Sequence, residues 1–310
     1  MRIKPKLSLL ALGLSLSMAA SYSTAEDIKI GISVSDLANP FFRQLARAAE
    51  DRAQALTAGE AQVTVVSSAY DLERQIQQIE QFVDAGIEVI LLSAASYNGL
   101  TEKIDEVRRG GVHVLAVDVA AARADATITT NNYEAGTQSC RYLAKELNYE
   151  GQVAIINGPQ VSSIIERVSG CLEVLDGYPA IRVVDTYQNG GGTFDGGFER
   201  MTHLLLASPD LDAVFVINDP SALGAEQAAL AAGRDDLIIL SVDGAPEVKA
   251  RMLTGETLIK GTAAQFPSQI GAKAAEVGFA LVRGEPVNRS IWLIDPELIT
   301  IRNVTNYTDW

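Results

Sequence analysis

Polar side chains stand at the ends of most of the apolar runs in this sequence. They are mainly carboxylates and amides that follow segments rich in Val, Ile and Leu, at Ser35-Asp36, Asp118, Asn157, Asn218-Asp219 and Asp243. In open parallel sheets, ligands bind beyond the carboxyl ends of the strands, so such groups could hold a polar ligand by hydrogen bonds. The alternative for any one of them is helix capping, and Asp219 before Pro220 is a good example.

A second candidate feature follows the first apolar run. Asn39 suits the N-cap of a helix, and Pro40 suits its first position. Phe41 and Phe42 in a first helical turn point about 100° apart, so both cannot pack well on the same core face. One of them is then available to line a site. The alternative is one core Phe and one incidental surface Phe.

The sequence offers little for catalysis or for metal binding. His113 and His203 are the only histidines, neither has Cys or His nearby at ligand spacing, and no Ser/His/Asp set occurs. The stretch 189–197, with five glycines, lacks the ending of a phosphate-binding loop and the spacing of a dinucleotide fingerprint, and is interpreted as a surface loop. We therefore expect a protein that is not an enzyme and that uses neither a metal nor a cofactor.

The N-terminus predicts export. Residues 1–25 carry a basic start, the apolar stretch 7–18 and the small-residue cleavage pattern Ser23-Thr24-Ala25, which is typical of a secretory signal peptide. The alternative, a retained anchor, is disfavoured because the apolar stretch is too short to span a bilayer. No later segment is apolar enough to cross a membrane, so no direct membrane insertion is expected.

The net negative charge of the chain restricts the classes of partner that we expect it to bind. The net charge of −14 becomes −17 once the three basic residues of the signal peptide are removed. An acidic surface argues against nucleic acid and anionic membrane as partners.

Cys140 and Cys171 both fall in segments predicted to be neighbouring helices. An even count in an oxidising compartment makes a disulfide between them plausible. The alternative is a pair of small buried thiols, because sequence alone does not supply the Cα separation that a disulfide requires.

Apolar runs alternate with segments of helical periodicity, such as 71–85, along the whole mature chain. The runs predicted as strands are 28–34, 62–67, 87–92, 112–117, 152–157, 181–186, 212–217, 237–242 and 258–263. Repeated βα units with nearly continuous Val, Ile and Leu strands predict parallel sheets covered by helices on both faces. Similar sets of strands precede and follow residue 130, so we expect an α/β fold with two doubly wound lobes.

Several short motifs follow one another in a characteristic order. They are Asn39-Pro40-Phe41-Phe42, Val117-Asp118, Glu166-Arg167 with Gly170, Ile217-Asn218-Asp219, Leu223-Gly224-Ala225, Val242-Asp243-Gly244, and Gln265 near Pro267. In these motifs the chain resembles the periplasmic sugar-binding proteins of the ribose/galactose-binding type, the substrate-binding components of ABC transporters. Each motif is weak alone, the ordered set is specific, and the resemblance covers essentially the whole mature chain.

The resemblance implies a type I periplasmic binding protein, with two Rossmann-like lobes joined by three crossings near residues 130, 265 and 294. The N-terminal lobe would comprise 26–130 and 266–293, and the C-terminal lobe 131–265 and 294–310, with the ligand closed between them. A monomer in the periplasm is expected.

The resemblance also implies nine ligand-binding residues: Asn39, Phe41, Phe42, Asp118, Arg167, Phe194, Asn218, Asp243 and Gln265. Phe41 would stack on a sugar ring, with Phe42 beside it and Phe194 opposite, because the C–H face of a sugar suits an aromatic surface. The carboxylates would accept hydrogen bonds, the guanidinium would donate them, and the amides could do both. The alternative for Arg167 is a surface helix residue paired with Glu166 or Glu173.

One position departs from the ribose-binding pattern, in which Arg follows the residue that matches Asp118. Here Val119 follows, which removes a two-pronged clamp on hydroxyls, so a deoxy sugar, another pentose or hexose, or a sugar alcohol is as well supported as ribose. The expected function is capture of such a solute for the permease subunits of an ABC transporter. The alternative is a periplasmic sensor that docks on a sensor kinase or chemoreceptor.

Overall fold

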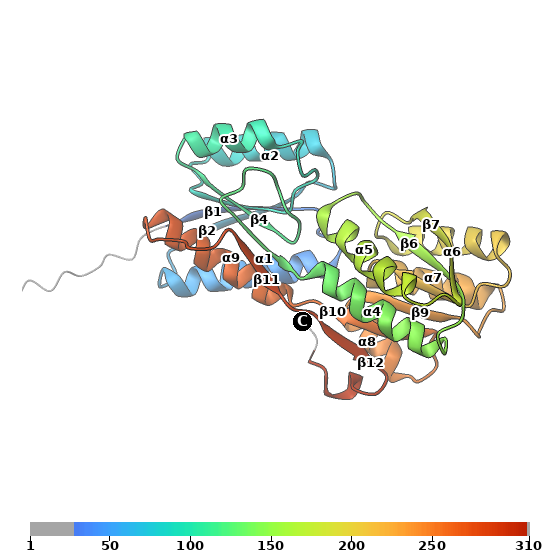
Figure 1. Ribbon diagram of the computed structural model, residues 1–310. Helices are drawn as coiled ribbons and strands as arrows, with labels where there is room; N and C mark the ends of the chain where they lie inside the picture. Colours follow the sequence, from blue (N-terminus) through green and yellow to red (C-terminus); the bar gives the residue numbers. More distant parts are fainter. Residues whose placement is uncertain (1–27, 309–310) are drawn as a thin grey trace, which may run out of the picture.

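A computed structural model describes residues 28–308, which form two α/β lobes lying side by side (Figure 1). The predicted signal peptide therefore lies outside the described residues. No helix within 28–308 has the length and apolar character needed to cross a membrane.

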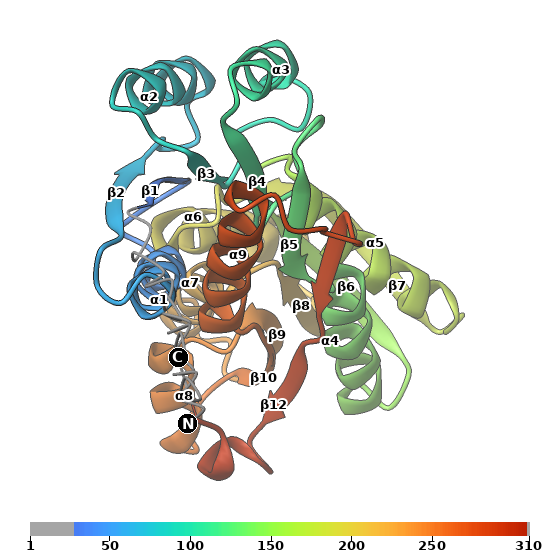
Figure 2. The same ribbon diagram turned by 90° about the vertical axis from the view of Figure 1, so that its left-hand side faces the viewer.

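The N-terminal lobe is built on a six-stranded parallel sheet with the order β11-β5-β4-β3-β1-β2. Its strands are β1 (Lys29–Val34), β2 (Gln62–Ser67), β3 (Val89–Leu92), β4 (His113–Val117), β5 (Ala126–Thr130) and β11 (Ile291–Ile294). Its helices are α1 (Pro40–Leu56), α2 (Leu72–Asp84), α3 (Thr101–Arg109) and α9 (Pro267–Val282). Helices α1 and α9 cover one face of the sheet, and α2 and α3 cover the other (Figure 2).

The C-terminal lobe repeats this plan with the order β12-β10-β9-β8-β6-β7. Its strands are β6 (Gly151–Asn157), β7 (Ile181–Asn189), β8 (Ala213–Val216), β9 (Ile238–Asp243), β10 (Ile259–Ala264) and β12 (Glu297–Thr300), and β12 alone runs antiparallel to its neighbour. Its helices are α4 (Asn132–Glu146), α5 (Ser162–Asp176), α6 (Phe194–Ala207), α7 (Asp219–Ala231), α8 (Pro246–Leu253) and the 3₁₀ turn Val304–Asn306. The prediction of two doubly wound lobes is confirmed.

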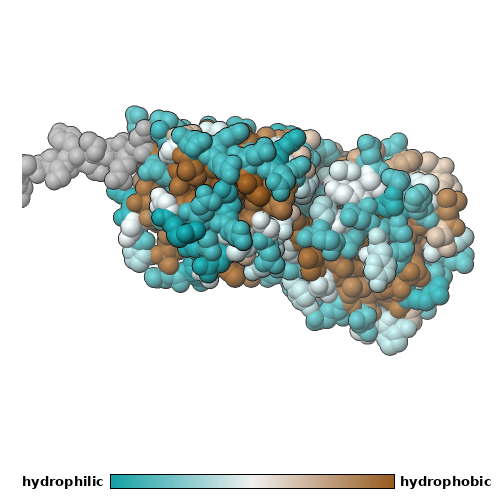
Figure 3. All heavy atoms as spheres, turned by 90° about the horizontal axis from the view of Figure 1, so that it is seen from above, coloured by the Kyte–Doolittle hydropathy of each residue, from teal (hydrophilic) through white to brown (hydrophobic). Residues whose placement is uncertain are grey.

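The chain passes from one sheet to the other three times, between β5 and α4, between β10 and α9, and between β11 and β12. The first and third crossings lie together, because the backbone N–H of Asn131 donates to the carbonyl of Ile294 (2.9 Å) and its side-chain amide reaches Asp295 (3.3 Å). The outline of the molecule narrows where the two lobes meet (Figure 3).

Two sequence-based expectations are wrong in detail. The nine predicted strands leave out β5, β11 and β12; β5 is rich in Thr, and the other two are four-residue edge strands with little room for a pattern. The stretch 189–197 is not all loop, because α6 begins at Phe194 with Thr193 as its N-cap. Gly196 and Gly197 serve close packing, since a Cβ on Gly197 would lie 2.0 Å from the carbonyl oxygen of Ser221 on α7.

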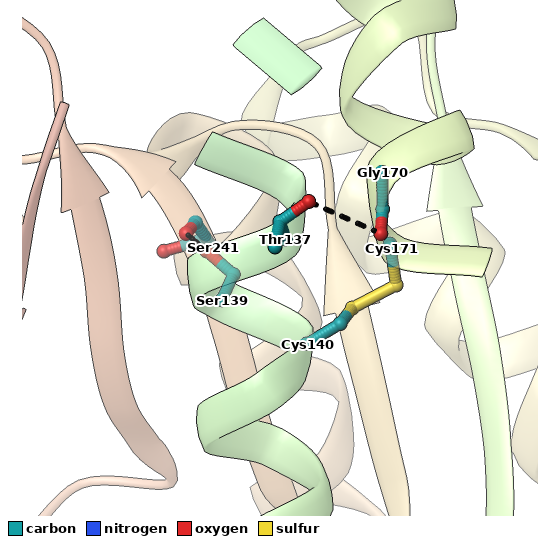
Figure 4. Close-up of a disulfide and its surroundings, with 6 residues drawn as sticks. All are labelled: Thr137, Ser139, Cys140, Gly170, Cys171 and Ser241. Atoms are coloured by element: carbon teal, nitrogen blue, oxygen red, sulfur yellow. Dashed lines mark hydrogen bonds between the residues drawn. A yellow bond between two sulfur atoms is a disulfide. The ribbon is translucent and has the colours of Figure 1, made fainter. Parts of the chain in front are cut away.

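Helices α4 and α5 are joined by a disulfide between Cys140 and Cys171, whose Cα atoms lie 5.0 Å apart (Figure 4). The helices can approach this closely because glycines lie at their contact. A Cβ on Gly136 would be 1.9 Å from the carbonyl oxygen of Arg167, and one on Gly170 would be 2.1 Å from that of Tyr133. Both cysteines are fully buried in the core beneath the sheet.

Candidate ligand-binding site

A cavity between the two lobes collects most of the predicted site residues. Its wall consists of Ser35, Asn39, Phe41, Phe42, Tyr70, Asp118 and Val119 from the N-terminal lobe, Pro159, Val161, Ser163, Ile164, Arg167, Gly192, Ile217, Asn218 and Asp243 from the C-terminal lobe, and Gln265 from the second crossing. Its empty volume, counted to the opening and including the solvent space there, is about 460 Å³. Eight of the nine predicted residues lie here.

The parallel topology explains why these residues meet. Ser35 follows β1, Asp118 follows β4, Asn218 lies just beyond β8, and Asp243 ends β9. The carboxyl ends of parallel strands share one edge of a sheet, and here the corresponding edges of both sheets face the same cavity.

The aromatic pair is placed by the start of α1. Asn39 caps the helix by accepting a hydrogen bond from the backbone N–H of Phe41 (2.9 Å), and Pro40 occupies the first turn, as expected. Phe41 and Phe42 pack edge to face, with ring centroids 5.2 Å apart. Both are buried in the core between α1, α9 and the sheet, and both also line the cavity. The alternative of an incidental surface Phe is therefore wrong.

Arg167 is held rigidly in the cavity wall and is 3 % exposed, so its interpretation as a surface residue is wrong. Its Nε donates to Oδ1 of Asn132 (2.9 Å), and one terminal nitrogen donates to the carbonyl of Ile217 (2.7 Å). The same nitrogen lies 3.6 Å from Oδ1 of Asp243. Among residues 28–308, no other cationic side chain lines the cavity wall.

Asp243 and Gln265 form a second fixed pair. The side-chain amide of Gln265 donates to Oδ1 of Asp243 (2.7 Å), and its backbone N–H donates to the Asp243 carbonyl (2.8 Å). Within the described chain, the buried Oε1 of Gln265 has no hydrogen-bond partner. A buried acceptor without a donor is costly, so a ligand hydroxyl at this point would be stabilising.

Asp118 lies in a tight turn in which the N–H of Val119 donates to the carbonyl of Val117 (2.7 Å), and its φ is 66°. Thr129 holds this turn by donating to the Asp118 carbonyl (2.5 Å). The carboxylate accepts no hydrogen bond from residues 28–308, although the residue is only 7 % exposed. Burial raises the pKa of Asp118 to about 7, with Arg167 opposing the rise and Asp243 adding to it.

Asp219 lies behind the wall and does not cap its helix, so the capping interpretation is wrong for this residue. Asn218 is the N-cap of α7, accepting from Ser221 N–H (3.2 Å) and donating to the carbonyl of Gly192 (2.8 Å). The carboxylate of Asp219 instead accepts hydrogen bonds from Ser241, Thr262 and the backbone N–H of Ala245, which fixes the turn after Asp243. Burial raises the pKa of Asp219 and of Asp243.

The raised pKa of Asp118 predicts a pH dependence of stability for the empty protein. The carboxyl titrates near 3.8 when exposed and near 7 in the folded protein. Between these values the folded state binds more protons, so the free energy of unfolding should fall as the pH rises from about 4 to about 7. Urea unfolding at pH 5 and pH 8 should show greater stability at pH 5, and Asp118→Asn should reduce the difference. Equal pH dependence in the two proteins would contradict this assignment.

Phe194 is the one predicted residue outside the cavity wall. It is 41 % exposed and lines a neighbouring groove between the lobes, together with Asn39 and Pro40 of α1 and with Pro220 and Leu223 of α7. The cavity wall also contains Tyr70, Val161 and Ile164, which the sequence did not predict as site residues. No motif in the sequence marks these positions.

The functional groups of the cavity wall indicate which class of ligand it can bind. It combines aromatic and aliphatic surface with carboxylates, amides and one guanidinium, which suits a small neutral solute with several hydroxyls. Within the described residues, no group of three or more His, Cys, Asp or Glu side chains could hold a metal ion.

Comparisons with known proteins agree with this architecture. Residues 30–286 match the model of the periplasmic binding protein domain. The ribose import binding protein RbsB of Bacillus subtilis is 28% identical over 269 residues, covering 86% of this chain and 85% of that protein.

Solved structures show the same fold. An ABC transporter solute binding protein from Bacillus halodurans, solved with bound myo-inositol, has a TM-score of 0.83 at 24% identity, covering 92% of this chain and 98% of that one. The fructose-binding periplasmic domain of a hybrid two-component system has a TM-score of 0.82 at 22% identity, covering 90% and 92%.

The fold and the extent of these matches define a type I periplasmic binding protein. The chain belongs to the periplasmic binding protein family, in its sugar-binding group of the ribose type. Its relatives are binding proteins and not enzymes.

Proposed function

We propose that this protein acts in the periplasm, where it captures a small sugar or sugar alcohol between its lobes and delivers it to the permease of an ABC importer. The observation that carries the proposal is the cavity between the lobes, where an aromatic pair faces buried hydrogen-bonding groups that lack partners within the described chain. The import role of the ribose-binding relative and the predicted signal peptide at 1–25 support the location and the partner.

In this proposal the two lobes supply complementary contacts. Phe41 packs against the C–H face of the sugar, and Asp118 accepts hydrogen bonds from its hydroxyls. Arg167 and Asp243 contact the sugar from the opposite lobe, and Gln265 does so from the second crossing. Asn39, Phe42 and Asn218 complete the wall. Because contacts come from both lobes, the ligand favours the closed state over any open one.

The moving units proposed are 26–130 with 266–293, and 131–265 with 294–310. Periplasmic binding proteins close their two lobes around the ligand by a hinge motion. The three crossings between the sheets described above are the segments about which these units would turn.

Val119 determines which sugars fit. It is 2 % exposed, and it lines the cavity as part of the same buried hydrophobic cluster as Val161 and Ile164. Such an apolar surface suits a part of the ligand that lacks a hydroxyl, as in a deoxy sugar or a short polyol. Val119→Arg should weaken the native ligand at least tenfold, because the longer side chain overfills the site and buries an unpaired charge. Calorimetry should show this loss, and Val119→Ile should bind within a few-fold of the wild type. Unchanged binding by Val119→Arg would contradict the placement.

The proposed function is tested by thermal-shift screening of purified protein against aldoses, ketoses, deoxy sugars, alditols and inositols. A ligand at 100 times its dissociation constant adds about 2.7 kcal/mol to the free energy of unfolding. At least one member should therefore raise the melting temperature by several degrees. If no sugar or polyol does so, while amino acids or other solutes do, the proposed ligand class is wrong.

Signalling is a second candidate, because one structural neighbour is a sugar-binding domain of a two-component system. The same capture would then report the sugar to a sensor kinase or a chemoreceptor. Genes for a permease and an ATPase beside this gene would favour import, and a sensor-kinase gene in that place would favour signalling.

A further inference from the structure

Three residues of the cavity wall other than glycine have left-handed backbone conformations. They are Tyr70 (φ 59°), Asp118 (φ 66°) and Asp243 (φ 138°). Such conformations are unfavourable for residues with a Cβ, and they cluster at functional sites where the surrounding structure maintains them. The two aspartates already have roles in the proposed site, whereas Tyr70 has none.

The turn that carries Tyr70 is held by other groups. It joins β2 to α2, and its preceding residue Ala69 is also left-handed (φ 53°). The N–H of Ser68 donates to the carbonyl of Val34 (2.8 Å), and the N–H of Asp71 donates to the carbonyl of Ser68 (3.0 Å). Asp71 in turn caps α2 through the N–H of Arg74 (2.8 Å). A glycine would suit the backbone of Tyr70 better, so its side chain is not explained by the turn.

Tyr70 lines the same cavity as Asp118 from its own lobe and Asp243 from the other, and the whole residue is 38 % exposed. Partial burial raises the pKa of its phenol above the usual range, and the charges of Asp118, Asp36 and Asp243 raise it further, so the hydroxyl stays protonated at neutral pH. This hydroxyl forms no hydrogen bond with residues 28–308. The cavity thus holds a phenol donor and, in Asp118, an acceptor without a donor of its own. A ligand hydroxyl can accept from the first and donate to the second.

We propose that Tyr70 is a ligand-binding residue that determines specificity at the Asp118 end of the cavity. Its hydroxyl donates to a ligand oxygen that in turn donates to Asp118, and its ring limits how far the ligand extends past Val119. This inference rests on the proposed sugar-binding function and names a contact that the family motifs in the sequence do not include.

The test compares Tyr70→Phe, Tyr70→Gly and the control Tyr97→Phe by calorimetry with D-ribose, xylitol, mannitol and myo-inositol. Tyr97 is in the same lobe, is 52 % exposed and does not line the cavity. Tyr70→Phe should weaken the best probe about 3- to 30-fold, as loss of one donor does. Tyr70→Gly should weaken it at least as much, keep or raise the melting temperature, and shift the preference from xylitol towards mannitol. Tyr97→Phe should bind like the wild type.

The outcomes separate this inference from the proposed function. If the wild type binds a probe and both Tyr70 variants bind it equally well, the role of Tyr70 is wrong and the function stands. If Tyr70→Gly lowers the melting temperature and leaves the affinity unchanged, Tyr70 is structural and the inference is also overturned. If the wild type binds none of the aldoses, ketoses, deoxy sugars, alditols and inositols of the wider screen, the proposed function and the inference fail together.

Discussion

Asp118→Ala should weaken binding of the sugar identified by screening by roughly 30- to 1,000-fold. The carboxylate is buried, faces the cavity and has no other hydrogen-bond partner within residues 28–308. Its loss would leave ligand hydroxyls buried without an acceptor, which costs about 2–4 kcal/mol. The folded protein itself should lose little stability, because the substitution removes a buried charge that no residue pairs with directly.

Calorimetry on folded Asp118→Ala measures this loss, and Asp84→Ala is the matched control. Asp84 ends α2 in the same lobe and is exposed on the surface, so its removal should leave the affinity unchanged. Arg167→Ala should weaken binding by a similar factor. It should also lower the free energy of unfolding by about 3–5 kcal/mol, because Asp243 and the carbonyl of Ile217 lose their buried partner. Near-unchanged affinity in both Asp118→Ala and Arg167→Ala would mean that the ligand binds elsewhere.

Removing the disulfide should lower the free energy of unfolding by about 3–4 kcal/mol. Cys140 and Cys171 are 31 residues apart in sequence, and closing a loop of that length restricts the unfolded chain by about this amount. The double variant Cys140→Ala/Cys171→Ala should therefore unfold at a lower urea concentration than the oxidised wild type.

The reduced wild type is the control for this comparison, and it should resemble the double variant. Sugar affinity should change little, because neither cysteine lines the cavity. The disulfide is therefore a structural cross-link between α4 and α5. Two thiols titrating in unfolded, unreduced protein, or equal stability of oxidised and reduced forms, would contradict this role.

The sequence predicts the site well where side-chain identity follows strand topology. Asn218 and Asp243 come at or just after apolar strands of the C-terminal sheet, so the parallel topology brings them to one edge of that sheet, and it brings Asp118 to the corresponding edge of the N-terminal sheet. Asn39 and Pro40 mark a helix start by capping chemistry that is local in sequence. These features need no long-range information.

What the sequence does not predict depends on backbone conformation and packing. Tyr70 lines the cavity from a turn in which two successive residues, Ala69 and Tyr70, are left-handed, and no residue preference of Ala or Tyr predicts that conformation. Asp219 is a residue type that often caps helices, but here it comes one position after the N-cap. Its carboxylate instead accepts hydrogen bonds from β9 and β10. Phe194 lies in a separate groove because α6 begins immediately at it, a boundary hidden by the surrounding glycines.

The most direct test of the central claim is a crystal structure of the protein with the sugar or polyol that stabilises it most. The account predicts the ligand between the lobes, with its C–H face on Phe41 and its hydroxyls within hydrogen-bond distance of Asp118 from one lobe and Arg167 from the other. A ligand bound outside this cavity, or one that contacts only one lobe, would contradict it.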